Sequence, residues 1–133
     1  MANPIIDTKT DTNTFGSILK ETISARITLV ETAAGQFGLN YQFVYSGIKS
    51  GSTSSDAPIA VSANGTYVAN PSPKVTYTIA GYSDTGTTIS MQVTIQVDIP
   101  ALGTKTIFNE TLSGSYGTDN LHSMVNHIAE KSK

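Results

Sequence analysis

Hydrophobic and polar residues alternate along most of this chain, and a period of two is the pattern of half-buried β-strands. The clearest run covers residues 89–99, where six apolar side chains alternate with Ser, Gln, Thr and Asp. Residues 37–46 and 74–80 alternate in the same way. We therefore predict that one face of each strand is buried. The predicted core side chains are Phe37, Leu39, Tyr41, Phe43, Tyr45, Val75, Tyr77, Ile79, Ile89, Met91, Val93, Ile95, Val97 and Ile99.

Shorter runs predict further strands between turn-forming residues. They cover residues 26–32, 58–63, 66–69 and 104–110, and residues 111–116 are either an extension of the last of these or a further short strand. The Asn64-Gly65 pair predicts a hairpin turn because both residues tolerate a positive φ. Residues 47–56 (GIKSGSTSSD) predict a loop. About seven or eight short strands with frequent turns favour an all-β fold, an antiparallel β-sandwich.

Two segments have a helical period instead. Phe15, Ile18, Leu19 and Ile23 would share one face of a short N-terminal helix. Apolar residues spaced by three and four predict a C-terminal helix within residues 118–133, which would lie on the sandwich. We divide the chain into a polar N-terminal arm, residues 1–13, and a single domain, residues 14–133. The arm is either loose or an added edge strand.

Composition narrows the classes of function. The 133 residues include 19 Thr but no Cys and no Trp, and 14% are charged, with a net charge of −2. Without Cys, disulfide scaffolds and thiolate metal sites are excluded. Eight basic residues spread along the chain argue against a nucleic-acid partner. The many Thr side chains suit the solvent-facing sides of strands.

Targeting signals are not found in the sequence. Its first 14 residues lack the basic start and apolar stretch of a signal peptide, and no run is long enough to span a membrane. We expect synthesis in the cytoplasm, with any release or export following a route that does not use a cleaved signal. Where the protein acts is left open.

Candidate catalytic motifs are few. Asp84-Thr85-Gly86 matches the DTG tripeptide of aspartic proteases, but Tyr82-Ser83 precede it where those enzymes have apolar residues, so we interpret it as a turn. His122 and His127 are five residues apart and would face different sides of a helix. We therefore predict no catalytic residue, no metal site and no cofactor, and a protein that is not an enzyme.

The six tyrosines are the more promising candidates, because a Tyr ring is apolar and its tip is polar. Tyr82 and Tyr116 lie in turn-like contexts, and we expect them to be the most exposed. Tyr41, Tyr45 and Tyr77 are expected to lie on core faces.

Four segments carry a resemblance to known proteins. They are the amphipathic stretch Phe15–Ile23, the strand Arg26-Ile27-Thr28-Leu29-Val30, Tyr45-Ser46-Gly47 and Val97-Asp98-Ile99-Pro100. Their order resembles the cytolysin/lectin group of β-sandwiches, which includes actinoporins and aegerolysins. In actinoporins the first helix enters the membrane, and a pocket lined by Ser and Tyr binds choline headgroups. The resemblance implies membrane insertion by Phe15, Ile18, Leu19 and Ile23, and a headgroup site near Tyr45 and Ser46.

These observations favour a non-enzymatic β-sandwich that binds membrane lipid or glycan, such as a pore-forming or toxin component. The expected ligand-binding residues are Tyr45, Ser46, Tyr82 and Tyr116. We also expect a homo-oligomer or a protein partner. The alternative is a structural, self-assembling subunit of a virion or appendage whose sheet edges pair with neighbours. An aspartic-type protease acting through Asp84-Thr85-Gly86 is the least favoured hypothesis.

Overall fold

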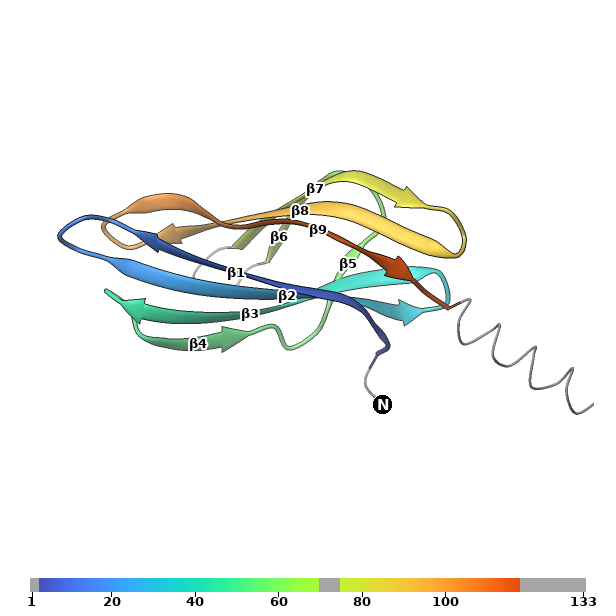
Figure 1. The fold of residues 1–133 in the computed structure, drawn as a ribbon, viewed down its shortest axis with the longest axis horizontal. Helices are drawn as coiled ribbons and strands as arrows, with labels where there is room; N and C mark the ends of the chain where they lie inside the picture. Colours follow the sequence, from blue (N-terminus) through green and yellow to red (C-terminus); the bar gives the residue numbers. More distant parts are fainter. Residues whose placement is uncertain (1–2, 70–74, 118–133) are drawn as a thin grey trace, which may run out of the picture.

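The computed structural model describes residues 3–69 and 75–117, which fold into nine strands (Figure 1). The strands are β1 (Ile5–Phe15), β2 (Glu21–Ala33), β3 (Gln36–Gly47), β4 (Gly51–Ser54), β5 (Ile59–Val61), β6 (Gly65–Ala69), β7 (Val75–Asp84), β8 (Thr88–Ile99) and β9 (Gly103–Ser115). They form two antiparallel sheets stacked on each other, so the predicted all-β, sandwich-like fold is confirmed.

The two sheets follow the chain with few crossings. Sheet A has the order β1-β2-β3, and both β4 and β5 pair with the far side of β3. Sheet B has the order β6-β7-β8-β9. The chain passes from sheet A to sheet B between β5 and β6. The expected hairpin at Asn64-Gly65 is therefore wrong, because these residues join strands of different sheets.

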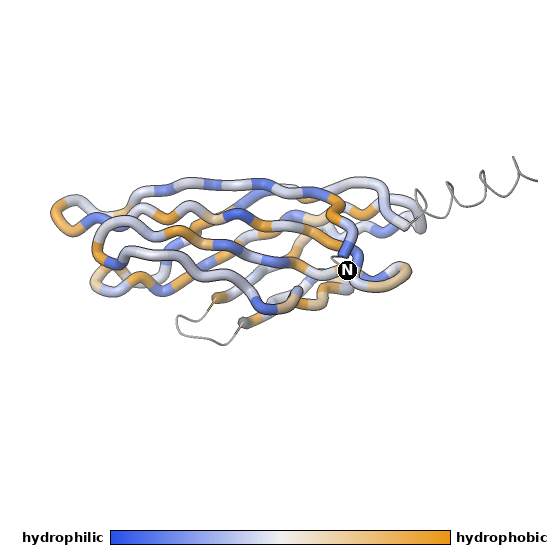
Figure 2. The backbone as a smooth tube through the Cα atoms, turned by 90° about the horizontal axis from the view of Figure 1, so that it is seen from below, coloured by the Kyte–Doolittle hydropathy of each residue, from blue (hydrophilic) through white to orange (hydrophobic). Residues whose placement is uncertain are grey.

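The core lies between the sheets and is built by the alternation of the sequence (Figure 2). All of the predicted core side chains are buried. Strand β2 adds Ile23, Ala25, Ile27 and Leu29 to the same layer. In β9 the pairing with β8 shifts at a bulge, so that the consecutive residues Ile107 and Phe108 are both buried. Each large apolar side chain buried in this way contributes about 1.5–3 kcal/mol to folding.

Side chains of β1 join the two sheets along one edge. Asp7 and Asp11 accept hydrogen bonds from the backbone N–H groups of Ser113 and Asn109, both at 2.9 Å. In alternation with them, Lys9 and Asn13 donate to the backbone carbonyl groups of Thr111 and Ile107. We call this row of contacts the β1–β9 seam. It gives hydrogen-bond partners to four backbone groups on the outer edge of β9, which would otherwise be open to pairing with other chains.

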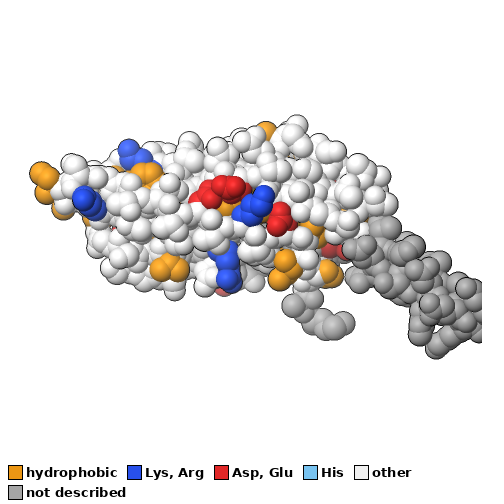
Figure 3. All heavy atoms as spheres, viewed as in Figure 1, with side chains coloured by type: hydrophobic (Ala, Val, Ile, Leu, Met, Phe, Trp, Pro, Cys, Tyr) orange, Lys and Arg blue, Asp and Glu red, His pale blue; other side chains and the backbone are white. Residues whose placement is uncertain are grey.

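The seam brings charged groups close together on the surface. Glu110 of β9 lies beside Asp11, and Figure 3 shows acidic and basic side chains gathered at this place in the middle of the molecule. The pKa of Glu110 is raised, first by its hydrogen bond with Asp11 and then by the negative charge of that residue. Gly114 allows the close approach of the strands, because a Cβ there would lie 2.9 Å from Cγ2 of Ile6.

The predicted N-terminal helix is wrong. Phe15 ends β1, residues 16–20 form a turn, and Ile23 belongs to β2. Gly16 has a φ of +92°, which interrupts a right-handed helix at this point. Of the two alternatives for the N-terminal arm, most of residues 1–13 lie in an edge strand, because β1 begins at Ile5 and pairs with β2.

Two further predictions are a loop at residues 47–56 and a helix at the C-terminus. The loop expected at residues 47–56 contains the short strand β4, which pairs with β3. The predicted C-terminal helix, together with His122 and His127, lies outside the described residues.

Candidate functional site

Three turns meet at one end of the sandwich, and we call this the loop end. They are residues 16–20 between β1 and β2, residues 48–50 between β3 and β4, and residues 100–102 between β8 and β9 (Figure 1, left). The backbone N–H of Ile48 donates to the carbonyl oxygen of Lys20 at 3.1 Å. A Cβ at Gly16 would lie 3.3 Å from a methyl group of Leu102. Both sheets therefore contribute to the loop end.

The loop end exposes apolar side chains that the core does not use. Ile18 is 95% exposed and Leu19 is 57% exposed, and Ile48 is also exposed. Single exposed apolar residues are common, but here two of them lie side by side at the tip of a long hairpin. Figure 3 shows these hydrophobic side chains at the far left of the molecule, with Lys or Arg side chains close to them.

Cationic side chains flank the apolar tip. Lys20 follows Leu19 directly, and Lys49 follows Ile48, and both Lys residues are exposed. The only acidic residue within these turns or next to them in β1–β4 is Glu21, which is buried and 1% exposed. The loop end of sheet A therefore presents apolar side chains together with positive charge.

Two glycines shape this tip. A Cβ at Gly16 would lie 1.9 Å from the carbonyl oxygen of Leu19, so no other residue fits that turn. Gly47 has a φ of +142°, and a Cβ there would lie 2.2 Å from the carbonyl oxygen of Lys20. These two positions let the β1–β2 turn and the β3–β4 turn pack against each other and direct Ile18 outwards.

Glu21 and Tyr45 both contact Lys49 of the β3–β4 turn. The carboxylate of Glu21 accepts a hydrogen bond from the backbone N–H of Lys49 at 2.7 Å. The ammonium group of Lys49 lies 4.6 Å from the centre of the Tyr45 ring, within the range of a cation–π contact. Burial raises the pKa of Tyr45, and the neighbouring Tyr41 and Glu21 raise it further. The hydroxyl group of Tyr45 and Oε2 of Glu21 are buried without a hydrogen-bond partner.

The structure places six of the eight predicted site residues at or near the loop end, but not all on its surface. Ile18, Leu19 and Ser46 are exposed. Tyr45 is buried, Ile23 is fully buried in the core, and Phe15 packs partly against it. Of the four residues expected to insert into a membrane, only Ile18 and Leu19 are therefore free to touch one.

Tyr82 and Tyr116 lie at the opposite end of the sandwich. Tyr116 is only 7% exposed and packs edge-on against Phe37, with ring centres 4.6 Å apart. The expectation that it is exposed is therefore wrong, because Tyr116, directly after β9, packs its ring against Phe37 at the start of β3. Tyr82 is half-buried. The predicted tyrosines thus form no single binding surface.

The Asp84-Thr85-Gly86 motif forms a hydrogen-bonded turn between β7 and β8. Asp84 Oδ1 accepts hydrogen bonds from the backbone N–H of Gly86 at 2.9 Å and from the hydroxyl group of Tyr116. This hydrogen bond to Asp84 is the largest of the causes that raise the pKa of Tyr116 to about 12. The carboxylate is engaged in turn formation, as the sequence-based interpretation of this motif expects.

Two further kinds of feature, a cluster of metal ligands and a membrane-spanning helix, are absent from residues 3–69 and 75–117. No group of three or more His, Cys, Asp or Glu side chains there could hold a metal ion. No helix within that part of the chain is long and apolar enough to cross a membrane.

Sequence reasoning missed Lys20, Ile48 and Lys49 as members of the candidate site. The only local signal was the pairing of an apolar residue with a lysine in two turns, Leu19-Lys20 and Ile48-Lys49. No family model, curated protein or solved structure matches the chain.

Proposed function

We propose that this protein is a non-enzymatic binding module that docks onto anionic membrane surfaces through its loop end. The observation that carries the proposal is the 95% exposed Ile18 beside Leu19, at the end of the sandwich that also carries the exposed Lys20 and the exposed Ile48-Lys49 pair. Apolar side chains that enter the acyl boundary and lysines that meet anionic headgroups are the two contributions by which peripheral proteins bind membranes.

The magnitudes are sufficient for reversible binding. Transfer of Ile18 and Leu19 from water would contribute about 1.5–3 kcal/mol for each fully transferred side chain. Each of Lys20 and Lys49 would add about 1 kcal/mol near an anionic leaflet. Docking in this way leaves the strands intact and needs no helix to detach. Pore formation and a toxin role would be later steps that follow this docking.

Self-assembly through sheet edges is the alternative function. The long edges of β1 and β9 face each other in the β1–β9 seam and are bridged by side chains. Within the described part of the chain, this leaves the shorter strands β4 and β5 at the other edge of sheet A, and β6 at the other edge of sheet B. The membrane proposal is favoured because its surface is exposed in the single chain.

Vesicle flotation tests the proposal directly. Wild-type protein should float with vesicles of phosphatidylserine and phosphatidylcholine, and should bind less well to pure phosphatidylcholine or in high salt. Ile18→Glu and Leu19→Glu should each reduce binding at least about tenfold, because they remove an apolar contact and add repulsion. Release of a trapped dye in the same samples would report pore formation.

A matched control comes from the other end of the molecule. Ile5 is 68% exposed there, so Ile5→Glu makes the same chemical change away from the loop end. This variant should bind vesicles like the wild type. The proposal fails if wild-type protein binds neither vesicle, or if the Ile5 variant loses as much binding as the Ile18 variant.

A further inference from the structure

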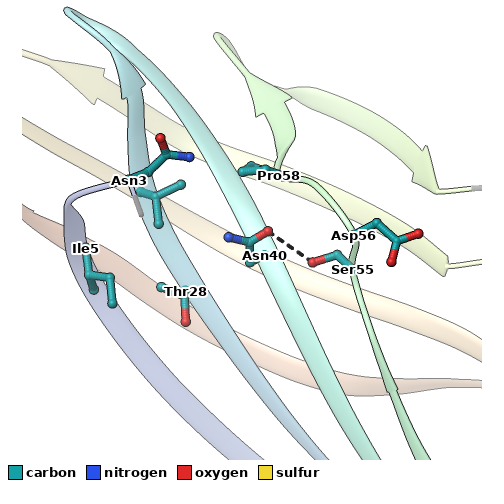
Figure 4. A pocket seen from close by; sticks show the side chains of 8 residues that line it. Asn3, Ile5, Thr28, Asn40, Ser55, Asp56 and Pro58 are labelled. Carbon is teal, nitrogen blue, oxygen red and sulfur yellow. Dashed lines mark hydrogen bonds between the residues drawn. The ribbon is translucent and has the colours of Figure 1, made fainter. Parts of the chain in front are cut away.

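A hollow with a volume of about 430 Å³ lies on the outer face of sheet A (Figure 4). It is bounded by the N-terminal segment at Asn3 and Ile5, by Thr28 of β2 and Asn40 of β3, and by residues 55–58 between β4 and β5. Its volume is within the range of small-ligand sites. The hollow extends from the middle of the strands away from the loop end, so it is separate from the proposed membrane surface.

Hydrogen bonds fix the polar groups of this hollow in advance. The hydroxyl group of Ser55 donates to Oδ1 of Asn40 at 3.1 Å and accepts from the backbone N–H of Tyr41 at 3.0 Å. The backbone N–H of Ser55 donates to the carbonyl oxygen of Tyr41, also at 3.0 Å. Because Oδ1 of Asn40 is engaged by Ser55, its Nδ2 points to the other side, towards Thr28 (Figure 4).

Apolar surface forms the remaining walls. Pro58 lies directly on β3, where Gly38 makes room for it, since a Cβ at Gly38 would be 2.6 Å from Cβ of Pro58. Ile5 on the opposite side of the hollow is 68% exposed (Figure 4). The hollow therefore combines ordered donors and acceptors with apolar patches.

We propose that this hollow binds one or two neutral sugar rings of a glycan. A sugar ring presents neighbouring hydroxyl groups, which both donate and accept, and apolar C–H faces. The Asn40 amide and the Thr28 hydroxyl match the hydroxyl groups, and Ile5 and Pro58 match the C–H faces. Among the described residues that line the hollow, only Asp56 is charged; its carboxylate points away from Asn40 and Thr28 (Figure 4), and its negative charge nearby disfavours acidic sugars.

Saturation-transfer NMR and calorimetry with defined saccharides test this inference. The probes are neutral trisaccharides of glucose, galactose, mannose and N-acetylglucosamine, with a sialylated trisaccharide as the acidic comparison. At least one neutral probe should bind with a Kd of about 1 mM or tighter. Asn40→Leu and Thr28→Val should each weaken that binding about tenfold, because each removes a hydrogen bond to the sugar.

A control substitution and a second measurement separate the possible causes. Gln96→Leu changes an exposed amide on sheet B and should leave saccharide binding unchanged. Vesicle binding should be unaffected in the Asn40 and Thr28 variants, because the hollow is not part of the loop end. The inference is overturned if no neutral probe binds, if the sialylated probe binds as well as the best neutral one, or if Thr28→Val and Asn40→Leu both bind like the wild type.

Discussion

The β1–β9 seam predicts a measurable loss of stability when its two carboxylates are removed. In the double variant Asp7→Ala/Asp11→Ala, the backbone N–H groups of Ser113 and Asn109 lose acceptors at 2.9 Å. A hydrogen bond to a charged acceptor contributes about 1.5–3 kcal/mol, and we expect about 1 kcal/mol for each, because both carboxylates are only half-buried and water can replace them.

The two losses should add, because the residues are four positions apart on one strand, about 13 Å. The sum of about 2 kcal/mol should lower the Tm by about 6–10 °C for a domain of this size. Circular dichroism during thermal unfolding measures this shift. Hydrogen exchange of the Asn109 and Ser113 amides gives a local readout, and both should exchange faster in the variant.

Asp56→Ala provides the control, since it removes an exposed carboxylate that is not part of the seam. It should leave the Tm close to that of the wild type. If the double variant melts within about 1 °C of the wild type, and the two amides exchange at the wild-type rate, the seam does not hold the sheets together. Opening the seam should also expose two long strand edges, so light scattering of the double variant should detect association.

Three further predictions concern single side chains. The pKa of Glu110 is raised in the folded protein, first by its hydrogen bond with Asp11. Protonated Glu110 therefore stabilises the fold fully below the usual carboxyl pKa of about 4.3, and this stabilisation is lost as the pH rises through the raised pKa. Glu110→Gln keeps a hydrogen-bond donor for Asp11 but removes the negative charge, so it should raise the Tm at pH 7 and not at pH 3.5. An equal change in Tm at both pH values would show that repulsion between Glu110 and Asp11 is not the reason. The phenol of Tyr116 should titrate near 12 in ring-carbon NMR, and Asp84→Asn should lower that pKa. Titration of the wild-type phenol near the ordinary tyrosine pKa of about 10 would refute the contact. Gly16→Ala should lower the Tm by about 5 °C or more, because its Cβ would overlap the carbonyl oxygen of Leu19; an unchanged Tm would show that the turn can rearrange without cost.

The sequence could predict the strands and their buried faces because alternation is a local property. Along β8 the six apolar residues from Ile89 to Ile99 are all buried, as their period of two requires. At Phe15–Ile23, however, the local pattern predicted a helix that is not there. Four apolar residues within nine positions fit one face of a helix, but they also fit two strand ends, Phe15 and Ile23, separated by the exposed tip at Ile18 and Leu19.

The candidate sites depended on contacts that no local pattern encodes. The loop end joins turns that are about 30 and 80 residues apart in the sequence, and the hollow joins the N-terminal segment to β2, β3 and the chain between β4 and β5. The sequence around Tyr116 is typical of a turn. The side chain is buried because its ring packs against Phe37 and its hydroxyl group donates a hydrogen bond to Asp84.

By itself, the sequence determined most of the strands and which of their side chains face the core, because the hydrophobic effect acts on each strand with a period of two. Only the tertiary structure decided how the sheets close on each other. The Asp, Lys and Asn side chains of β1 could equally have faced water, until stacking of the sheets brought the edge of β9 within hydrogen-bond distance. Packing that buried the core also left Ile18 and Leu19 outside it, because a turn at the end of a sandwich has no second layer to cover it.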